Sequence, residues 1–177
     1  MAVPFAVTHV ILTIVLVGLF RDFFMKHKFS TSFLVLAGFA GLLPDAGIVI
    51  DWLLAAFFNS STSVHRLYTH SVIWAVLFAA IAVFVHFSAK KKQYNLFQYK
   101  IKKNSVVLIF AIIAFGWLIH ILLDCMLAGT EHLTLIPGLP LTCPRAVSSN
   151  VLASFDAIIL LAWLFWEQHK HRIIDYV

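Results

Sequence analysis

Histidine and aspartate residues occur inside stretches of this chain that are otherwise almost entirely apolar. His120 and Asp124 are four residues apart in one such stretch, so on a helix both side chains leave the same face about 6 Å apart. An imidazole and a carboxylate at this spacing can bind one metal ion, as pairs of histidines do in helical zinc sites. A buried His–Asp hydrogen bond would explain the pair equally well, so the pair alone leaves both interpretations open.

Further ionisable side chains lie in the apolar stretches, where each is costly to bury and is therefore a functional candidate. Each also has a structural explanation. His9 could be a hydrogen-bonded packing residue, and Asp45 could cap a helix that is broken at Pro44. His65 and His70 flank the start of another apolar stretch, where a solvated histidine is common. The remaining candidates, which could pair with neighbouring helices, are Asp51 and Asp156.

The composition of the chain indicates the elements that must position these residues. Of the 177 residues, 62% are hydrophobic and only 12% are charged, and the mean hydropathy is +0.94. A soluble domain needs far more charge, so the composition predicts a membrane protein. The length allows one compact domain over residues 1–177.

Five apolar stretches are long enough, or nearly so, to cross a hydrocarbon core about 30 Å thick. They are Val3–Phe20, Ser32–Phe58, Ser71–Phe87, Ser105–Ala128 and Val151–Trp166. We therefore predict an all-α fold, a polytopic membrane bundle of about five transmembrane helices. The second helix should be kinked or broken at Leu43-Pro44-Asp45, because proline cannot continue a helix without disrupting it.

Lysine and arginine are distributed unevenly between the ends of these helices. The segments after the first, third and fifth stretches contain 11 of the 13 basic residues, which leaves Arg66 and Arg145 on the opposite side. Because cytoplasmic loops are rich in Lys and Arg, this bias predicts a cytoplasmic C-terminus and an N-terminus outside. We expect a multi-pass protein of the cell (inner) membrane, with a basic cytoplasmic loop over residues 88–104 and an extracytoplasmic loop over residues 129–150. The lysines of Lys90–Lys103, interleaved with aromatic residues, are expected to contact anionic lipid headgroups and no nucleic acid.

Several of the candidate residues share one depth in the predicted bundle. At 1.5 Å per residue, His9, Asp45 and His120 fall at similar heights in the outer half of the membrane. Four further candidates lie at or above that level: Asp124, His65, His70 and His132. Scattered packing residues have no reason to share a depth, so the layer indicates one site that is built by several helices.

The residue types of this layer favour metal chemistry. Neutral imidazoles and carboxylates suit zinc, iron or manganese rather than calcium. The candidates suffice for one or two divalent ions, which would activate a water and polarise a phosphoryl oxygen. Arg66, next to His65, could hold a phosphate bidentately, although it could also anchor a lipid headgroup.

The candidate residues of this layer belong to short motifs that occur along nearly the whole chain. The motifs are Thr8-His9, Leu43-Pro44-Asp45, His65-Arg66, Thr69-His70-Ser71 and His120-x-x-x-Asp124, followed by Gly129 and Pro137. In this order the motifs resemble those of the YdjM family of inner-membrane-associated, metal-dependent hydrolases. The resemblance implies a multi-helix membrane protein in which His and Asp bind a metal. That family usually has a second acid two residues after the Leu-Pro-Asp motif, where this chain has Gly47, and Asp51 could substitute for it.

A looser resemblance concerns the order of the candidate ligands. Zinc-dependent phospholipase C has an early His, an Asp, a His, a His-x-x-x-Asp pair and a further His. The residues of this chain that fit that order are His9, Asp45, His70, His120, Asp124 and His132. This likeness also indicates cleavage of a phosphate ester.

These observations lead to one functional hypothesis, a membrane-bound metal-dependent hydrolase. It would cleave a phosphate ester of a lipid or lipid-linked substrate at the outer leaflet. We expect the primary metal, zinc before iron or manganese, to be held by His70, His120, Asp124 and Asp45. A second metal or the proton transfers would use His9, His132 and Asp51. Catalytic roles are assigned to Asp45, His65, Arg66 and His132, with Arg66 holding the phosphate.

Two other classes of protein stay open at this point. An ion or metal transporter would use intramembrane His and Asp, although such sites usually lie between inverted repeats, and no repeat is visible here. A non-enzymatic scaffold would use the polar residues to hold its helices together. The two cysteines, Cys125 and Cys143, could form a disulfide or stay reduced.

Overall fold

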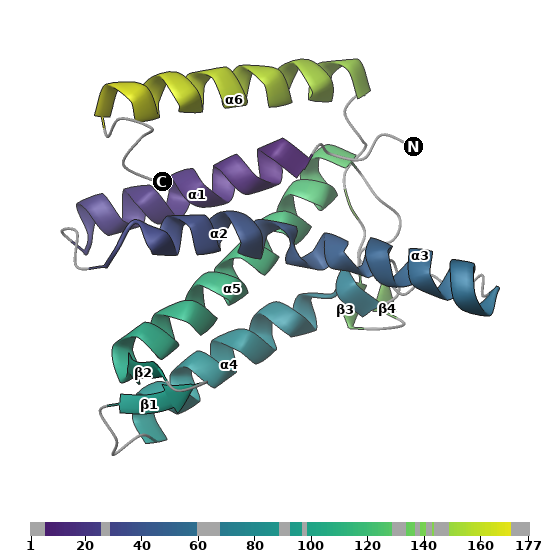
Figure 1. The fold of residues 1–177 in the computed structure, drawn as a ribbon. Coiled ribbons are helices and arrows are strands. Elements are labelled where there is room, and N and C mark those ends of the chain that lie inside the picture. The colour runs from purple at the N-terminus through teal and green to yellow at the C-terminus, as the bar shows by residue number, and fades with distance from the viewer. Residues whose placement is uncertain are drawn as a thin grey trace.

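Long helices make up most of the chain (Figure 1). They are α1 (Ala6–Phe23), α2 (Ser32–Leu42), α3 (Ala46–Phe58), α4 (Val72–Ser88), α5 (Lys103–Leu123) and α6 (Ser149–Lys170). A 3-10 turn, η1 (Leu43–Asp45), joins α2 to α3, and a π-helical turn, η3 (Asp124–Ala128), continues α5. The structure is a computed structural model that describes residues 6–25, 29–59, 68–88, 93–96, 99–128, 134–136, 139–140, 143 and 149–170.

Successive helical passes alternate in direction (Figure 1). α2, η1 and α3 together form the second pass, and α1 and α6 run parallel to each other. The end of α1, the start of α5 and the end of α6 therefore share one end of the molecule, at the left in Figure 1. The start of α1, the start of α4 and the end of α5 share the other end. The segments in which the sequence concentrates lysine and arginine thus follow helices that finish at the same end.

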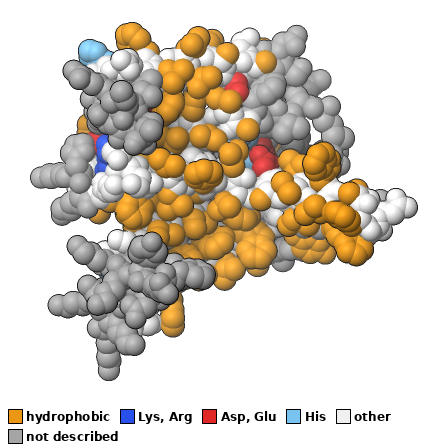
Figure 2. Space-filling view, viewed as in Figure 1, with side chains coloured by type: hydrophobic (Ala, Val, Ile, Leu, Met, Phe, Trp, Pro, Cys, Tyr) orange, Lys and Arg blue, Asp and Glu red, His pale blue; other side chains and the backbone are white. Residues whose placement is uncertain are grey.

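The described helices have the length and the surface of membrane helices. Three stretches are long and apolar enough to cross a membrane, namely Ala6–Phe23, Ser32–Phe58 and Asn104–Met126, and α4 is a shorter apolar helix. Large hydrophobic side chains such as Trp52, Phe84 and Phe165 lie exposed, and Figure 2 shows hydrophobic side chains over much of the visible face. Such a surface suits lipid rather than water. The predicted fold class, a helical membrane bundle, is confirmed.

The second apolar stretch is broken at Pro44, as predicted. Proline lacks the N–H group that an α-helix needs, and here α2 ends at Leu42 and α3 begins only at Ala46. Asp45 stands at the N-cap position of α3, yet its side chain makes no capping hydrogen bond. The capping explanation for Asp45 is therefore wrong, and its carboxylate is available for another role.

The two long loops each contain a short antiparallel strand pair. In the basic loop β1 (Gln93–Leu96) pairs with β2 (Tyr99–Lys102), and in residues 129–150 β3 (Thr134–Ile136) pairs with β4 (Leu139–Pro140). A disulfide between Cys125 and Cys143 ties the second loop to η3. The two cysteines, whose state the sequence left open, are thus bonded to each other.

Small residues let three helices approach one another closely. A Cβ atom at Gly41 of α2 would lie 2.7 Å from the carbonyl oxygen of His9 in α1. A Cβ atom at Gly116 of α5 would lie 2.6 Å from Cβ of Ala40 in α2. Side chains cannot occupy such short gaps, so glycine permits this crossing, in the way that small residues do between membrane helices. The crossing sets His9 of α1 beside His120, one turn beyond Gly116.

Two apolar clusters lie along α5. The first, between α1, α2 and α5, consists of Val17, Leu34, Ala37, Ala40 and Ile112. The second, between α4 and α5, consists of Ala75, Trp117 and Ile121. They fix α5 against the helices on both of its sides, and His120 and Asp124 are carried at its end.

Candidate metal centre

The His120–Asp124 pair has the geometry that its spacing predicts. His120 lies in the last turn of α5 and Asp124 begins η3, and His120 Nε2 lies 3.3 Å from Asp124 Oδ2. Both side chains are buried, His120 with an exposed fraction of 0% and Asp124 with 5%. The imidazole of His120 and the carboxylate of Asp124 thus lie next to each other in the interior of the protein.

His70, which lies just before α4, completes a triangle of ligand atoms. Its Nε2 atom is 3.0 Å from Asp124 Oδ2 and 3.1 Å from His120 Nε2. Tetrahedral zinc binds N and O ligands at about 2.0–2.1 Å, which puts neighbouring ligand atoms about 3.3 Å apart. The three atoms, separated by 3.0 to 3.3 Å, therefore have the spacing of three vertices around one such ion.

Asp45 lies on the more open side of this triangle. Its Oδ1 atom is 3.5 Å from His120 Nε2 and 3.7 Å from His70 Nε2. The Asp45 side chain is 23% exposed, whereas those of His70 and Asp124 are 8% and 7% exposed. Asp45 can therefore act as a fourth ligand or meet a molecule that enters the site from its open side.

His9 reaches the same carboxylate from the opposite direction. Its Nε2 atom is 3.3 Å from Asp124 Oδ1, and its ring stacks on that of His120 with 4.0 Å between centroids. Asp124 thus presents Oδ2 to His70 and His120 and presents Oδ1 to His9. Among the described residues Asp124 Oδ1 has no hydrogen-bond partner although it is buried. A buried carboxylate oxygen in this state is suited to a cation.

A backbone contact orients His120. Its Nδ1–H group donates a hydrogen bond of 2.7 Å to the carbonyl oxygen of Gly41. Because Nδ1 then carries the proton, Nε2 of the neutral ring has its lone pair directed at His70, Asp45 and Asp124. This is the arrangement of a metal-ligating histidine whose second nitrogen is held by an acceptor.

Two further contacts hold the segments that carry His70 and His9. Trp117 Nε1 donates to the carbonyl oxygen of Thr69 at 3.0 Å, next to His70. Asp156 of α6 accepts a hydrogen bond of 2.5 Å from the backbone N–H of Thr8 and a second one from the Thr8 hydroxyl, next to His9. The prediction that Asp156 pairs with a neighbouring helix is confirmed.

Sequence reasoning missed two of these supporting residues. Trp117 precedes His120 by three residues and so shares its helix face. Gly41 lies shortly before the Leu-Pro-Asp motif in a run of small residues. Both signals are present in the sequence, but only a known helix crossing connects them to the site.

The described residues supply ligands for one ion more readily than for two. Two groups have ligand atoms within 4.8 Å of one another: His9, His120 and Asp124, and Asp45, His70 and His120. The groups share His120, and its Nδ1 atom is already bonded to Gly41, so it can give only Nε2. A second ion would therefore keep only His9 and the other oxygen of Asp124 from this set.

Several predicted site residues do not join the cluster. Asp51, expected to replace the acid that the chain lacks at Gly47, belongs to neither group of possible ligands among the described residues. It follows Asp45 by six residues on α3, about 9 Å farther along the helix axis. Three more predicted residues lie outside the described part of the chain: His65, Arg66 and His132.

Fold and site together define a helical membrane protein in which His and Asp from several helices form a group able to bind a metal ion. The chain belongs to the YdjM inner membrane protein family, whose model matches residues 5–175. No curated protein and no solved structure matches the chain. Membership of this family supports a location in the membrane, as the apolar helices do.

Proposed function

We propose that this protein is a metal-dependent hydrolase that cleaves a phosphate ester of a membrane lipid or lipid-linked substrate. The observation that carries this proposal is the triangle of Nε2 of His70, Nε2 of His120 and Oδ2 of Asp124, with Asp45 on its open side. Catalytic zinc sites characteristically have three protein ligands and one position left for water or substrate. A divalent ion bound here, zinc being the best match to the ligands, would supply an acidified water and polarise a phosphoryl oxygen.

The remaining chemistry belongs to the chain's own residues. Asp45 lies beside the open position, where its carboxylate can orient a water and accept its proton. His9 stacks on His120 and meets the far oxygen of Asp124, so it fixes the direction of the Asp124 carboxylate. The predicted roles of Arg66 in holding the phosphate, and of His65 and His132, remain part of this proposal.

The proposed site faces the extracytoplasmic side. The count of lysine and arginine supports this orientation. An independent argument comes from the disulfide Cys125–Cys143, whose first cysteine directly follows Asp124. Structural disulfides persist in oxidising compartments and are rare in the cytosol. Both arguments support a multi-pass protein in which the metal end of the bundle faces outside.

A lipid substrate is supported by the surroundings of Asp45. α3, which begins directly after it, exposes large apolar side chains such as Ile48, Val49 and Trp52. A phosphate ester with a hydrocarbon chain could reach Asp45 by diffusing within the membrane, and its chain would then lie against apolar side chains. A free, fully hydrated phosphate ester would gain nothing from such a surface.

The test is metal content and phosphate release measured on the same detergent-purified samples. Wild-type protein is compared with His120→Ala/Asp124→Ala, and His86→Ala serves as the control because it removes a histidine at the far end of α4. After reconstitution with zinc, manganese or iron, we expect near-stoichiometric metal and hydrolysis of phosphatidic acid or another lipid phosphate in the wild type and the control. The double variant should lose both.

Other results would lead to another class of protein. Absence of bound metal after reconstitution would contradict the proposal and leave the cluster as a packing device. Bound metal without hydrolysis, together with metal movement into proteoliposomes, would favour a transporter. The metal content and the activity therefore separate the three hypotheses.

A further inference from the structure

Asp124, the buried carboxylate of the proposed metal centre, lies where the regular helix α5 has already ended. α5 ends at Leu123, and Asp124 begins the π-helical turn η3. Turns of this kind are rare and occur frequently at functional sites. Because the α-helical hydrogen-bond ladder stops at this point, the residues that follow Asp124 must help to fix its place.

The carboxylate of Asp124 has to be placed accurately, because it meets three imidazole rings. Its Oδ2 atom is 3.0 Å from Nε2 of His70 and 3.3 Å from Nε2 of His120. Its Oδ1 atom is 3.3 Å from Nε2 of His9. A ring that gives the lone pair of Nε2 to a metal cannot also donate a hydrogen bond from that atom. For metal binding, the position of Asp124 must therefore come from its backbone and from His9.

A covalent bond holds the backbone directly after Asp124. The next residue, Cys125, is bonded to Cys143, which lies 18 residues further along the chain. Both cysteines pack against the apolar cluster of Ala75, Trp117 and Ile121, between α4 and α5. The disulfide thus fixes the start of η3 against two packed helices. Without it, Cys125 would be joined to Cys143 only through the intervening chain.

The same apolar cluster also supports the other segments that carry proposed ligands. Residues that belong to the cluster or pack against it stand one or two positions from each ligand in the sequence. They are Leu43 near Asp45, Val72 near His70, Ile121 near His120 and Cys125 near Asp124. Trp117 of the cluster also donates to the carbonyl oxygen of Thr69, next to His70. The disulfide therefore belongs to the packed layer that aligns the four ligands with one another.

We infer that the Cys125–Cys143 disulfide positions Asp124, so that the affinity of the site for a divalent metal depends on the oxidation of this cysteine pair. This role rests on the proposed metal centre and adds a covalent control to it. The two cysteines act as positioning residues and not as ligands, because both sulfurs are used in the S–S bond.

The bond forms by thiol–disulfide exchange with a disulfide oxidant outside the cytoplasm. The two thiols give up two protons and two electrons, the S–S bond of the pair forms, and the S–S bond of the oxidant breaks to give two thiols. Cys125 and Cys143 are half-buried, so such a partner can reach them. Since thiols stay reduced in the cytosol, the chain binds metal weakly until this end of the bundle has left it. Metal loading then follows oxidation.

The test measures binding of Co²⁺ to full-length protein in mild detergent, because four-coordinate Co²⁺ absorbs visible light more strongly than six-coordinate Co²⁺. In the wild type the disulfide is broken by a phosphine reductant, which takes the oxygen of a water molecule and leaves two thiols. The reductant is removed before Co²⁺ is added. In Cys125→Ala/Cys143→Ala the bond is absent and no thiol is left. Competition with a coloured chelator gives the dissociation constant.

Two controls separate positioning from other effects. The double cysteine variant treated with the same reductant has no bond to break, so its affinity should not change. Phe78→Leu in α4 removes bulk that packs against the same cluster and leaves the disulfide intact. The unfolding temperature of each sample shows how much stability was lost.

We expect the oxidised wild type and Phe78→Leu to bind Co²⁺ with similar affinity and to show intense visible bands. Breaking the disulfide by either route should weaken binding about 10–100-fold, the usual effect of losing a residue that orients a ligand, and should weaken the visible bands. Reoxidation with oxidised glutathione should restore the affinity and the spectrum of the wild type, and neither in the double variant.

Three results would overturn this role of the disulfide. Unchanged affinity and spectrum after reduction would show that Asp124 is placed without it, and the metal centre would stand. Equal loss of affinity in Phe78→Leu at a similar unfolding temperature would show a general effect of stability. Tighter binding after reduction, with a sulfur-to-cobalt charge-transfer band that the double variant lacks, would make a free cysteine a ligand. Absence of Co²⁺ binding by the oxidised wild type would instead contradict the proposed metal centre itself.

Discussion

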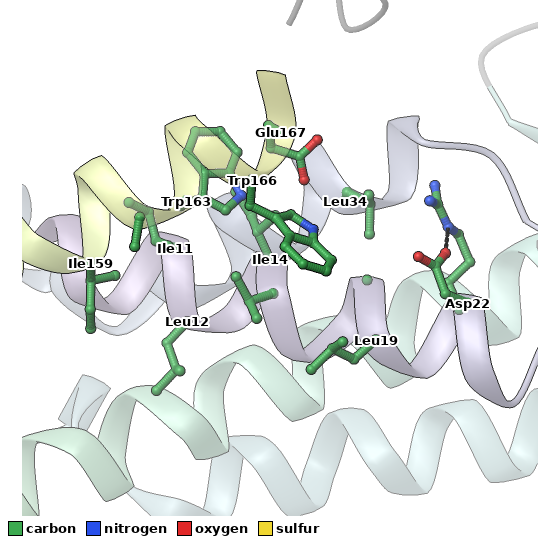
Figure 3. A pocket seen from close by; sticks show the side chains of 14 residues that line it. Ile11, Leu12, Ile14, Leu19, Asp22, Leu34, Ile159, Trp163, Trp166 and Glu167 are labelled. Atoms are coloured by element: carbon green, nitrogen blue, oxygen red, sulfur yellow. Dashed lines mark hydrogen bonds and ion pairs between the residues drawn. The ribbon is translucent and has the colours of Figure 1, made fainter. Parts of the chain in front are cut away.

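The two ends of α1 accommodate buried charge in different ways. At its N-terminal end α1 is pressed against α2 and α5, where Gly41 and Gly116 leave no room for a side chain. The polar groups there converge to within 3.0 to 3.7 Å of one another, a space that fits an ion. From Ile11 to its C-terminal end α1 is separated from α6 by a cavity of about 390 Å³ (Figure 3), which is far larger than an ion. Helix separation, more than the types of charged residue, thus decides what each end can bind.

The largest expected effect is on the metal content. It is measured after ionisable side chains are removed at one end of α1 or at the other. His120→Ala/Asp124→Ala should lower the metal content from near one ion per protein to the background. Arg21→Ala/Glu167→Ala should leave it unchanged, because both residues line the distant cavity. Elemental mass spectrometry measures both variants. Equal loss of metal in the two would show that bundle stability, and not ligation, controls the metal content.

The next largest effect, on stability and metal content, is expected from a substitution at the place where α1 and α2 cross. Gly41→Val would force a side chain against the His9 carbonyl oxygen, which a Cβ would approach to 2.7 Å. Overpacking of this kind costs about 1–3 kcal/mol, so we expect a lower unfolding temperature in detergent and a reduced metal content. Gly18→Ala is the control, because its Cβ has ordinary space. A Gly41→Val variant with wild-type stability and metal affinity would contradict the proposed role of the crossing.

A smaller effect should follow from removing the hydrogen bonds that join α1 to α6. Asp156→Ala leaves the Thr8 N–H group and hydroxyl without their acceptor, a loss of about 1–3 kcal/mol in unfolding free energy. Because Thr8 precedes His9, we also expect a several-fold weaker metal affinity. Chemical denaturation and metal competition with a chelator measure the two effects. Unchanged stability in Asp156→Ala would show that α6 is not fixed to α1 at this point.

The smallest effect concerns the indole donors at the two ends. Trp117→Phe removes the hydrogen bond to the carbonyl oxygen of Thr69, worth about 1 kcal/mol, and should weaken metal binding only a few-fold. Trp163→Phe should leave metal binding unchanged, because Trp163 lines the cavity between α1 and α6 and not the metal centre. The two variants are matched in chemistry, so a swap of their effects would invalidate the assignment of the two ends.

The depth of the site could be predicted from the sequence, because the rise of a helix is fixed at 1.5 Å per residue. This rule placed His9, Asp45 and His120 in one layer, and the structure brings them together with His70 and Asp124. The break at Pro44 followed from the missing N–H group of proline. These features depend on position along a helix axis, and sequence gives that position directly.

Features that depend on how the helices cross could not be predicted. The rise along an axis does not say which faces meet, so Gly41 and Trp117 had no assigned role, and Asp51 was included although it lies outside both ligand groups. The cavity between α1 and α6 depends on the separation of two helices that are far apart in sequence. The disulfide also stayed undecided, since two cysteines in a sequence do not reveal how close they lie.

The bonds between Asp156 and Thr8 have a thermodynamic consequence, because they connect α6 to the residue that precedes His9. A lipid that spreads or closes α1 and α6 acts on these bonds, and they hold the residue next to His9. If such a lipid changes the metal affinity by some factor, the metal changes the lipid affinity by the same factor. The lipid composition of the membrane would then set how much metal the protein retains.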